Sequence, residues 1–536
     1  MLQKNLTYII LVLSLFLISA KGASATTYFV SPTGNDNNNG SQSAPFKSFV
    51  KSVSVLNPGD ELKINPGTYS ERLIINKSGN ANNWIKISAA SGRPIINGNF
   101  SHIPLDINGD YINVSGLDVQ KGKNPSGTTG VCLNINVQSQ NIVIDDMKIH
   151  ECKGHAISVY GQNVTIQNSD VYRSNLAFYE GNYVGGWGSG IKGHVDAKNV
   201  TVKNNKVYEN FGEGIAMTRV VGSVIENNTT YDNYAVNIYI DNSPNSIVRN
   251  NFSYYTNNTM FYIKGTKGRC YELAEEYYAG WGAQMSNIEV YNNIGVDCYY
   301  GITFFDGGQA GTQIKSVSIH NNLLWNIERT GTSIDPLPTQ GTNGYYKNIV
   351  HSKRGVDIWT DLKSGMNFNT NLWVSGKPSV AIANGAGDQY GQPDFITTPS
   401  ISNPNSYKLK TTSAAFQAGI GPFQSGFSTV IGASANAVPS PTPSPTVQPS
   451  PSPTPTVVPS PLVSPSPSPT LVPSPSPTSC SEDINLDGVV NIKDYTILVS
   501  DFFSTNPVNP RSDINGDSSV NLYDFSLLSA KFFSNC

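Results

Sequence analysis

A phrase of alternating apolar and polar residues that ends in asparagine or aspartate recurs along the chain at a fixed interval. The intervals from Asn205 to Asn228 and from Asn228 to Asn251 are both 23 residues, and Asp145 lies 23 residues before Asn168. Alternation predicts short strands, and the closing polar residues suit sharp turns. A unit of two or three such strands cannot bury its own apolar side, but identical units stacked about 4.8 Å apart can. The repeat therefore predicts a mainly β chain wound into a parallel β-helix.

The asparagines that close the phrases are expected to hold this stack together. They fall above one another, so their amides can hydrogen-bond from coil to coil as a ladder. We therefore interpret them as ladder and turn residues rather than ligand-binding groups. Asn-X-Ser/Thr triplets such as the one at Asn163 lie inside the strands, so we interpret them as fold residues rather than glycan acceptors.

Segments at both ends of the repeat resemble the ends of secreted right-handed parallel β-helix proteins. The N-terminal segments run from Tyr28 to Asp36, from Ala44 to Phe49 and from Pro58 to Tyr69, and the C-terminal one runs from Pro393 to Ala433. The resemblance covers roughly residues 27 to 435. It implies a short N-terminal helix that begins at the Pro-Phe segment and caps the stack, because an uncovered end would expose core and strand edge.

Composition changes abruptly beyond residue 437. Residues 438 to 479 are almost entirely Pro, Ser, Thr and Val, so they have no apolar set to bury and favour extended polyproline II. Such a stretch is a semi-rigid spacer between parts that fold independently. We therefore expect a β-helix domain over residues 26 to 437 and a small second domain over residues 480 to 536.

The beginning of the chain is typical of a secretory signal peptide over residues 1 to 25. Lys4 precedes an apolar run, and Ala23–Ala25 supplies a small-residue cleavage pattern. The run is too short for a spanning helix, and no later stretch reaches the roughly 18 apolar residues that one needs. We expect a secreted monomer with no membrane span after cleavage, and the alternative is an uncleaved membrane anchor.

Charge and cysteine content fit an exported protein. Loss of Lys4 and Lys21 from the 35 basic residues leaves 33 against 38 acidic ones, and this mildly acidic balance without a basic cluster argues against a nucleic-acid partner. The six cysteines, an even number, fit disulfide bonds. Buried free thiols are the open alternative. Pairing within single structural units would join Cys132–Cys152, Cys270–Cys298 and Cys480–Cys536.

Two stretches near the C-terminus space their oxygen-bearing residues like calcium-binding loops. Such a loop binds through its first, third, fifth, ninth and twelfth residues and through the backbone carbonyl of the seventh. Gly488 permits the sharp turn in the first loop, and Ser518 replaces that glycine in the second, so the second loop is expected to bind less tightly. The expected ligands are Asp483, Asn485, Asp487, Val489, Asn491 and Asp494, and then Asp513, Asn515, Asp517, Ser519, Asn521 and Asp524.

Aspartate at the last position of both loops resembles the pattern of type I dockerin domains. The resemblance implies a helix after each loop, from Tyr495 to Phe502 and from Phe525 to Phe532. It also implies Ca²⁺ as cofactor and a partner that bears a cohesin domain, either a scaffold or a cell-surface protein. Apolar residues such as Leu498 and Leu527 would divide between the core and the cohesin-binding face.

A chemical site on a β-helix has to be a strip of side chains on one outer face. Strand alternation turns the first and third residues after each inward apolar residue outward. Aligned on Ile157, Ile191, Ile215, Ile238, Phe261 and Ile302, the second strands gather their charged and aromatic side chains in the middle coils. We call this set the outer strip, and it consists of Lys192, His194, Tyr239, Asp241, Tyr262 and Lys264.

Other residues adjoin the outer strip. Glu213 is ambiguous, because strict alternation turns it inward, although it can also lie on the preceding turn. Two insertions rich in aromatic residues, residues 174 to 189 and 265 to 286, are expected to form walls that stack on sugar faces.

The outer strip resembles the substrate-facing strip of β-helix polysaccharide lyases of family 9 and their chondroitinase-B-like relatives. The resemblance implies β-elimination at a uronate sugar of a polysaccharide. Lys192 would be the base, helped by Lys264 and Arg219, and the leaving oxygen would take its proton from His194 or Tyr239. Glu213 and Asp241 would be the calcium ligands of the cleft. That family carries an aspartate cluster before this strand where the present chain offers Glu213 alone, so calcium in the cleft stays open.

Two other functions remain compatible with the sequence. A glycoside hydrolase needs two carboxylates about 5 to 10 Å apart, which Glu213 and Asp241 on successive coils can supply. In the other, the charged strip only recognises a glycan and catalyses nothing.

Overall fold

The computed structural model describes residues 25–124, 130–181, 187–276, 285–307, 313–335, 337–424 and, with gaps, 481–531. The expected spacer, most of the expected signal peptide and the Cys480–Cys536 pair lie outside these residues. The chain divides into two compact units, Met1–Ser440 and Pro441–Cys536. No helix in the described part of the chain is long and apolar enough to cross a membrane.

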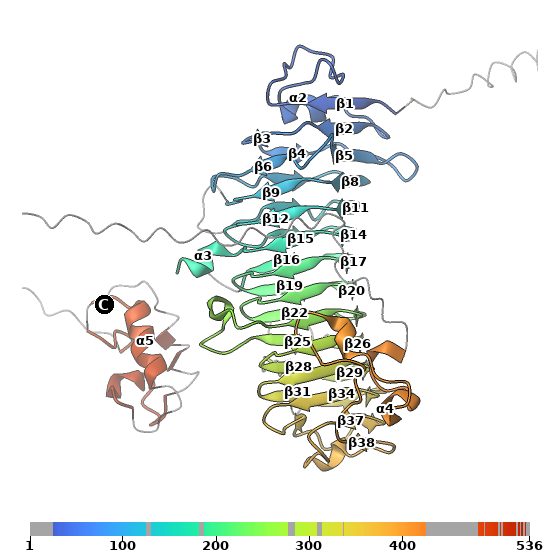
Figure 1. Cartoon of the computed structure of the whole chain (residues 1–536). Coiled ribbons are helices and arrows are strands. Elements are labelled where there is room, and N and C mark those ends of the chain that lie inside the picture. Colours follow the sequence, from blue (N-terminus) through green and yellow to red (C-terminus); the bar gives the residue numbers. More distant parts are fainter. Residues whose placement is uncertain are drawn as a thin grey trace, which may run out of the picture. The chain divides into compact units, whose positions relative to one another are not determined.

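The first unit is a right-handed parallel β-helix of three sheets, as the repeat and the resemblance predicted (Figure 1). Successive coils each add one strand to a sheet, and the strands within each sheet pair in parallel. The first sheet contains β1 (Thr27–Val30), β2 (Glu61–Ile64), β5 (Ile85–Ala89), β8 (Ile112–Ser115), β11 (Gln140–Asp145), β14 (Gln162–Gln167), β17 (Lys198–Lys203), β20 (Val221–Glu226), β23 (Ile247–Arg249), β26 (Ser286–Tyr291), β29 (Ile314–His320), β33 (Gly344–Tyr346) and β36 (Asn367–Asn369), with β32 (Thr339–Gln340) beside β29.

The other two sheets complete each coil. The second contains β4 (Leu73–Ile75), β7 (Leu105–Ile107), β10 (Leu133–Ile135), β13 (Ile157–Val159), β16 (Ser189–Gly193), β19 (Glu213–Thr218), β22 (Val236–Asp241), β25 (Arg269–Glu275), β28 (Tyr300–Asp306), β31 (Thr330–Ile334) and β35 (Ile358–Thr360). The third contains β3 (Thr68–Tyr69), β6 (Ile95–Asn97), β9 (Asp118–Gln120), β12 (Lys148–His150), β15 (Asp170–Tyr172), β18 (Lys206–Tyr208), β21 (Thr229–Tyr231), β24 (Phe252–Tyr254), β27 (Ile294–Val296), β30 (Leu323–Ile327), β34 (Ile349–Ser352), β37 (Leu372–Trp373) and β38 (Gln389–Tyr390).

Stacked aliphatic side chains fill the inside of the β-helix. In the first sheet, Ile144, Ile166, Val202, Ile225 and Val248 lie in register on successive strands and are all buried. This continuous column is what the alternating phrases predicted, since every second residue of each phrase is apolar. Burial of each such side chain contributes about 1.5–3 kcal/mol, so the stack is stabilised along its whole length.

Short helices and irregular segments lie at the N-terminal end of the β-helix, between its strands and on its outer face. The expected N-terminal capping helix is α2 (Phe49–Ser54), in which the Ser48 side chain accepts the Lys51 backbone N–H and Phe49 stacks on Tyr69. Further short helices are α3 (Leu176–Tyr179), η1 (Thr259–Phe261), η2 (Ala381–Ala383), η3 (Pro404–Tyr407), α4 (Ala414–Gln417) and η4 (Pro422–Gln424). Near the C-terminal end, Tyr407 and Ile420 cover the outward apolar residues Ile294 and Leu323 of the third sheet.

The predicted asparagine ladder is confirmed. The side-chain amide of each member donates to the side-chain oxygen of the next at 3.0–3.2 Å. The residue before most members has a positive φ, from 53° to 57°, in the left-handed region that asparagine tolerates best among residues with side chains. The buried members are Asn205, Asn228, Asn251, Asn293, Asn322, Asn348 and Asn371.

Asn251→Ala is expected to lower the free energy of unfolding of the β-helix by about 3 kcal/mol. The Asn251 side chain accepts the Asn228 backbone and side-chain N–H groups and donates to the Ile225 carbonyl and to Asn293. Its removal leaves these buried groups unpaired, at about 1–3 kcal/mol for each that finds no new partner. Urea unfolding followed by circular dichroism measures the loss, and Asn367→Ala, at an exposed strand position, is the control. Equal stability of the two variants would contradict a structural role for the ladder.

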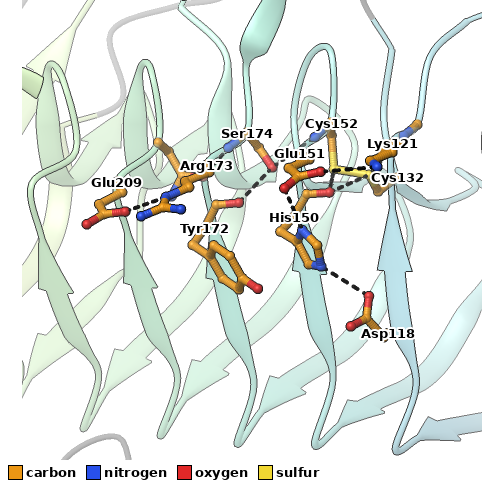
Figure 2. Close-up of polar contacts among 12 residues, drawn as sticks. Asp118, Lys121, Cys132, His150, Glu151, Cys152, Tyr172, Arg173, Ser174 and Glu209 are labelled. Atoms are coloured by element: carbon orange, nitrogen blue, oxygen red, sulfur yellow. Dashed lines mark hydrogen bonds and ion pairs between the residues drawn. A yellow bond between two sulfur atoms is a disulfide. The ribbon is translucent and has the colours of Figure 1, made fainter. Parts of the chain in front are cut away.

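The disulfides Cys132–Cys152 and Cys270–Cys298 are both present, which confirms two of the three predicted pairs. Figure 2 shows the first pair beside a group of charged side chains on the third sheet. His150 Nε2 lies 3.1 Å from Asp118 Oδ1, and its Nδ1 lies 3.7 Å from Glu151 Oε1. Burial opposes a charge on His150, but its contacts with Asp118 and Glu151 outweigh burial and raise its pKa to about 9.

The raised pKa of His150 predicts a pH-dependent stability. A group whose pKa is raised on folding stabilises the fold fully below its unfolded pKa of 6.5, and this stabilisation is lost as the pH rises through about 9. We therefore expect His150→Gln to be less stable than the wild type at pH 6, with a difference that shrinks toward pH 9. His102→Gln is the control, because burial and Arg72 lower the pKa of His102. If the urea midpoints of the wild type and His150→Gln differed by the same amount at pH 6 and pH 9, His150 would not carry the stabilising charge.

The second unit has its own small core. Its helix α5 (Ile492–Ser500) corresponds to the helix expected after the first loop but begins three residues earlier, within that loop, and η5 (Pro510–Ser512) precedes the second loop. The second expected helix is partly described, and Leu527 within it is 38% exposed. Phe502 and Phe532 lie outside the described residues. The buried residues are Ile484, Val490, Leu498, Val520 and Leu528.

Candidate functional site

The register of the second sheet confirms the predicted alignment for its middle coils. Ser158, Lys192, Ala216 and Tyr239 are consecutive partners on β13, β16, β19 and β22, next to the inward isoleucines. The column continues with Glu272 on β25 and then Thr303 on β28. The outer strip therefore runs through Lys192 and Tyr239 as expected, and it continues differently beyond them.

The alignment on Phe261 is wrong, and Tyr262 and Lys264 are not in the outer strip. Phe261 ends the 3-10 helix η1, and the inward residue of this coil is Tyr271, which pairs with Ile238. Asn251 and Asn293 are 42 residues apart, so this coil is longer than its neighbours. The extra residues lie on both sides of β25 (Arg269–Glu275), and so the strand starts later in this coil than in its neighbours.

Tyr271 and Cys270 explain this register. The Tyr271 hydroxyl donates to the Asn251 and Ile294 carbonyls inside the β-helix, which satisfies its polar end. Cys270 forms its disulfide with Cys298 of the next coil. Arg269 and Glu272, which the sequence placed in the second insertion, therefore belong to β25. Tyr277 and Trp281 of that expected insertion lie outside the described residues.

Lys192 and Glu213 form an ion pair on the outer strip. Lys192 Nζ lies 3.4 Å from Glu213 Oε2, and the two side chains are only 13% and 7% exposed. Glu213 is the first residue of β19, where strand alternation does not yet apply, and so its side chain reaches Lys192 rather than the core. The Ser189 hydroxyl donates to the same Glu213 oxygen at 2.8 Å. A buried ion pair with an extra hydrogen bond holds both groups in one geometry.

His194 lies beside this pair as a neutral ring. It stacks on Tyr160 with 4.1 Å between the ring centroids, and its Nε2 lies 3.2 Å from the Ser158 hydroxyl. Burial, together with the nearby His155, Lys192 and Arg219, lowers its pKa to about 2. Burial and Lys192 likewise lower the pKa of His155 to about 3.

Tyr239 and Asp241 occupy β22 in different environments. The Tyr239 hydroxyl donates to Glu276 Oε1 at 2.7 Å, and burial raises its pKa well above 10, so it stays a phenol. Asp241 is completely buried, and its Oδ1 accepts the Asn242 side-chain amide and the Glu276 backbone N–H. Asp241 was expected to face the cleft, but it instead fixes the turn that follows β22.

Sequence reasoning missed Glu272. It lies in the column of Lys192 and Tyr239 and is only 4% exposed. It forms an ion pair with Arg269, whose Nε lies 3.2 Å from Glu272 Oε1. Burial raises its pKa to about 7 against the opposing charge of Arg269, and Glu213 adds to the rise. The predicted Cys270–Cys298 disulfide could have indicated the position of Glu272, because it places Cys270 and the residues beside it in a coil of the β-helix rather than in a loop.

Aromatic rings form a wall beside the start of β19 and β22, as expected for the first insertion. Figure 1 shows α3 projecting beside β16. Phe178 of α3 packs against Trp187 and Tyr234, with ring centroids 5.2 and 5.1 Å apart. Tyr179 stacks on Phe211 at 4.4 Å, and 58% of the Tyr179 residue stays exposed. Tyr183 lies outside the described residues.

The residues of the outer strip do not fit a calcium ion. Glu213 is engaged by Lys192 and Ser189, and Asp241 is buried in hydrogen bonds to backbone and amide groups. Among the described residues of the β-helix, no three His, Cys, Asp or Glu side chains converge in a way that would hold a metal ion.

The first C-terminal loop folds around its acidic residues. Asp494 is completely buried, and its two oxygens accept the backbone N–H groups of Asn485 and Asn491 at 3.0 and 2.9 Å. The Gly488 N–H donates to Asp483, and Gly488 has a φ of 87°, which confirms the expected turn. Asp487 lies outside the described residues.

The second loop repeats this arrangement. Asp524 is buried and accepts the N–H groups of Ile514 and Asn515, while Asp513 accepts those of Gly516 and Ser518. Ser518 takes the glycine position of the turn with a φ of 69°. Asn521 lies outside the described residues. Carboxylate, amide and carbonyl oxygens that close on one short loop are the donors Ca²⁺ prefers, so the residues of both loops fit calcium.

Comparison with known proteins agrees with this architecture. A family model described as Pel9A-like, right handed beta helix region, matches residues 28–232, and one described as right handed beta helix region matches residues 179–371. A model of the dockerin type I domain matches residues 481–532. Pectate lyase L of Dickeya dadantii (strain 3937) is 27% identical over 179 residues, which are 30% of this chain and 40% of that protein. Pectate lyase L of Dickeya chrysanthemi is 25% identical over the same shares, so the chain spans less than half the length of these curated relatives.

One solved structure compared with this chain has a TM-score above 0.5, which is a likeness of fold alone. The complex of XylC with xylose is 13% identical, with a TM-score of 0.51 over 70% of this chain and 88% of that one. The crystal structure of pectate lyase Pel9A is 17% identical, with a TM-score of 0.40 over 73% of this chain and 91% of that one.

Proposed function

From the premise that this chain is a Pel9A-like right-handed β-helix protein with a C-terminal type I dockerin domain, we propose that it is a polysaccharide lyase. It cleaves a uronate-containing polysaccharide by β-elimination on the outer strip of the second sheet. The observation that carries the proposal is the enclosed Lys192–Glu213 pair, which lies within the Pel9A-like region.

Lys192 acts as the base in this proposal. The proton beside a uronate carboxylate is weakly acidic, so removing it requires a base in contact and positive charge to stabilise the enolate-like product. A lysine takes a proton only in its neutral form. Glu213 Oε2, 3.4 Å from Nζ, is the acceptor for the proton that Lys192 first loses. Arg219, whose charge helps to lower the pKa of the adjacent His194, supplies positive charge.

Tyr239 supplies the proton for the leaving oxygen. Only the methyl group of Ala216 separates it from Lys192 along the column. Its high pKa keeps the hydroxyl protonated, and the hydrogen bond to Glu276 orients it. His194 is a weaker choice, because its half-buried ring is neutral and bears no acidic imidazolium proton.

A glycoside hydrolase is the second candidate, and Glu272 favours it. Glu213 pairs with Lys192 and accepts a hydrogen bond from Ser189, whereas burial raises the pKa of Glu272 to about 7, so that much of Glu272 is protonated at neutral pH. Two carboxyl groups with such different environments are the pair that glycoside hydrolysis requires. Glu272 takes the role for which the sequence suggested Asp241.

The products separate these functions. The full-length secreted chain is incubated with pectin, alginate, glycosaminoglycan and xylan panels, and products are followed by ultraviolet absorbance and by reducing ends. A lyase forms unsaturated uronides that absorb in the ultraviolet, and this is the expected result. Reducing ends without that absorbance would establish hydrolysis, and a glycan that binds without either product would establish a non-catalytic binder.

The dockerin domain implies a cohesin-bearing partner and, with the two disulfides, fits an extracellular protein. In our proposal it tethers the lyase to a scaffold or to the cell surface through the spacer. We also propose that the β-helix domain ends at residue 437 and that the spacer ends at residue 479. Pull-down of the calcium-loaded chain with a panel of cohesin domains tests the tether, and binding to none of them would refute it.

A further inference from the structure

A basic pocket lies beside the outer strip, between the 255–268 insertion and β28. Its volume is about 260 Å³. It is lined by four cationic side chains and two tyrosines, and no acidic residue lies among the described residues that line it: Lys264, Lys267, Arg269, Arg329, Tyr299 and Tyr300.

Two of the four cations already have carboxylate partners. Lys267 is 4% exposed and its Nζ lies 3.2 Å from Glu328 Oε1, while Arg269 is paired with Glu272. These ion pairs fix the side chains of Lys267 and Arg269 and neutralise most of their positive charge.

The other two cations are available to a ligand. Lys264 and Arg329 are exposed and form no ion pair within the described residues. The Arg329 guanidinium lies over both tyrosines, 5.5 Å from the ring centroid of Tyr300 and 5.8 Å from that of Tyr299. Its Nη1 is 3.4 Å from the Tyr299 hydroxyl, so the arginine is oriented before any ligand binds.

The pocket lies on the same line of the second sheet as the Lys192–Glu213 pair. Glu213 begins β19 and Arg269 begins β25, with β22 between them, and Arg269 pairs with Tyr300 of β28. Two coils correspond to about 10 Å along the β-helix. A polysaccharide that follows the strip from Lys192 therefore reaches the pocket within a few sugar units.

We propose that this pocket is a binding subsite for an anionic sugar, whose negative group is held by Lys264 and Arg329 and whose ring lies against Tyr299 and Tyr300. Guanidinium groups bind planar carboxylates through two parallel hydrogen bonds, and tyrosine rings pack on sugar faces. A uronate carboxylate and a sulfate ester share this chemistry. The subsite rests on the proposed function only in that its occupant belongs to the polysaccharide that Lys192 acts on.

The test is equilibrium binding to the full-length chain by calorimetry. The ligands are galacturonate and mannuronate oligosaccharides, a sulfated glycosaminoglycan oligosaccharide and neutral xylo-oligosaccharides. Lys264→Gln combined with Arg329→Gln is expected to weaken binding of one anionic class by about 10- to 100-fold, because two charge-assisted contacts are lost. Binding of the neutral ligand should change little. The anionic class that responds identifies the carboxylate or the sulfate.

A matched variant removes the same two charges elsewhere. Lys198→Gln combined with Arg354→Gln changes an exposed lysine and an exposed arginine away from the pocket and should retain wild-type affinity. Equal losses in both double variants, or no anionic oligosaccharide bound by the wild type, would overturn the subsite. If the wild type binds such a ligand through Lys264 and Arg329 but forms no unsaturated product, the lyase proposal fails and the subsite stands. If product forms and KM is the same in both double variants, only the subsite fails.

Discussion

Lys192→Ala is expected to lower kcat/KM for a uronate polysaccharide by about 100- to 10,000-fold, the range that positioned acid–base groups contribute. The enclosed geometry is the reason. Lys192 is 13% exposed and fixed by Glu213, which Ser189 in turn orients, so the substitution removes a base that is held in one position. Rates of unsaturated uronide formation, at substrate concentrations below and above KM, measure the loss.

Three further variants define what Lys192 does. Lys198→Ala, at an exposed position on β17 of the first sheet, is the control and should keep wild-type activity. Lys192→Arg keeps the positive charge but cannot lose a proton near neutral pH, so it should be as inactive as the alanine variant. Substantial activity of Lys192→Arg would make residue 192 an electrostatic group rather than the base. Full activity of Lys192→Ala would refute the assignment of Lys192 as the base. If Glu272→Gln lost activity while the Lys192 variants kept it, hydrolysis would be favoured over β-elimination.

Removal of calcium is expected to unfold the C-terminal unit while the β-helix stays folded. If free calcium was about 1,000 times Kd, chelation lowers the free energy of unfolding of this unit by about 4 kcal/mol. That loss is large for a unit whose described core consists of five buried apolar residues. Heteronuclear NMR of a segmentally labelled chain, or limited proteolysis with and without chelator, measures it. Cohesin binding should disappear in the same titration.

Asp494→Ala tests the contribution of the first loop to calcium binding independently of the second loop. Asp494 is completely buried and orders the loop through the Asn485 and Asn491 N–H groups, besides being an expected ligand. Isothermal titration should show one calcium site lost or weakened at least 100-fold, with the second retained. Lys493→Ala, at an exposed neighbouring position, is the control and should retain both sites. The calcium-loop interpretation would be contradicted if Asp494→Ala kept both calcium sites. It would also be contradicted if the wild-type C-terminal unit stayed folded after a chelator removed calcium.

Local sequence patterns were sufficient to predict the overall architecture of the β-helix. The 23-residue interval, the asparagines that end each phrase and the alternation between them predicted the stack, the ladder and the strands that bear Lys192 and Tyr239. These are features of single coils, and a regular repeat makes neighbouring coils alike. The two confirmed disulfides join cysteines that are close in sequence, 20 and 28 residues apart, which is why pairing within single structural units predicted them.

The coil between Asn251 and Asn293 shows where such patterns stop being sufficient. Its 42-residue length leaves two apolar segments, around Phe261 and around Tyr271, that can each supply the strand. Local alternation does not choose between them. The choice depends on which side chain fills the core and satisfies its polar atoms there, and on a disulfide to the next coil.

The sequence by itself therefore determined the β-helix, the two dockerin-type loops and the central position of Lys192, because each depends on spacing along the chain. Only the tertiary structure decided that Glu213 turns toward Lys192, that Asp241 is buried and that Glu272, rather than Tyr262, follows Tyr239 in the column. Burial, ion pairing and register are properties of the assembled stack. They are set by which coils lie above and below a residue and by how long the insertions between them are.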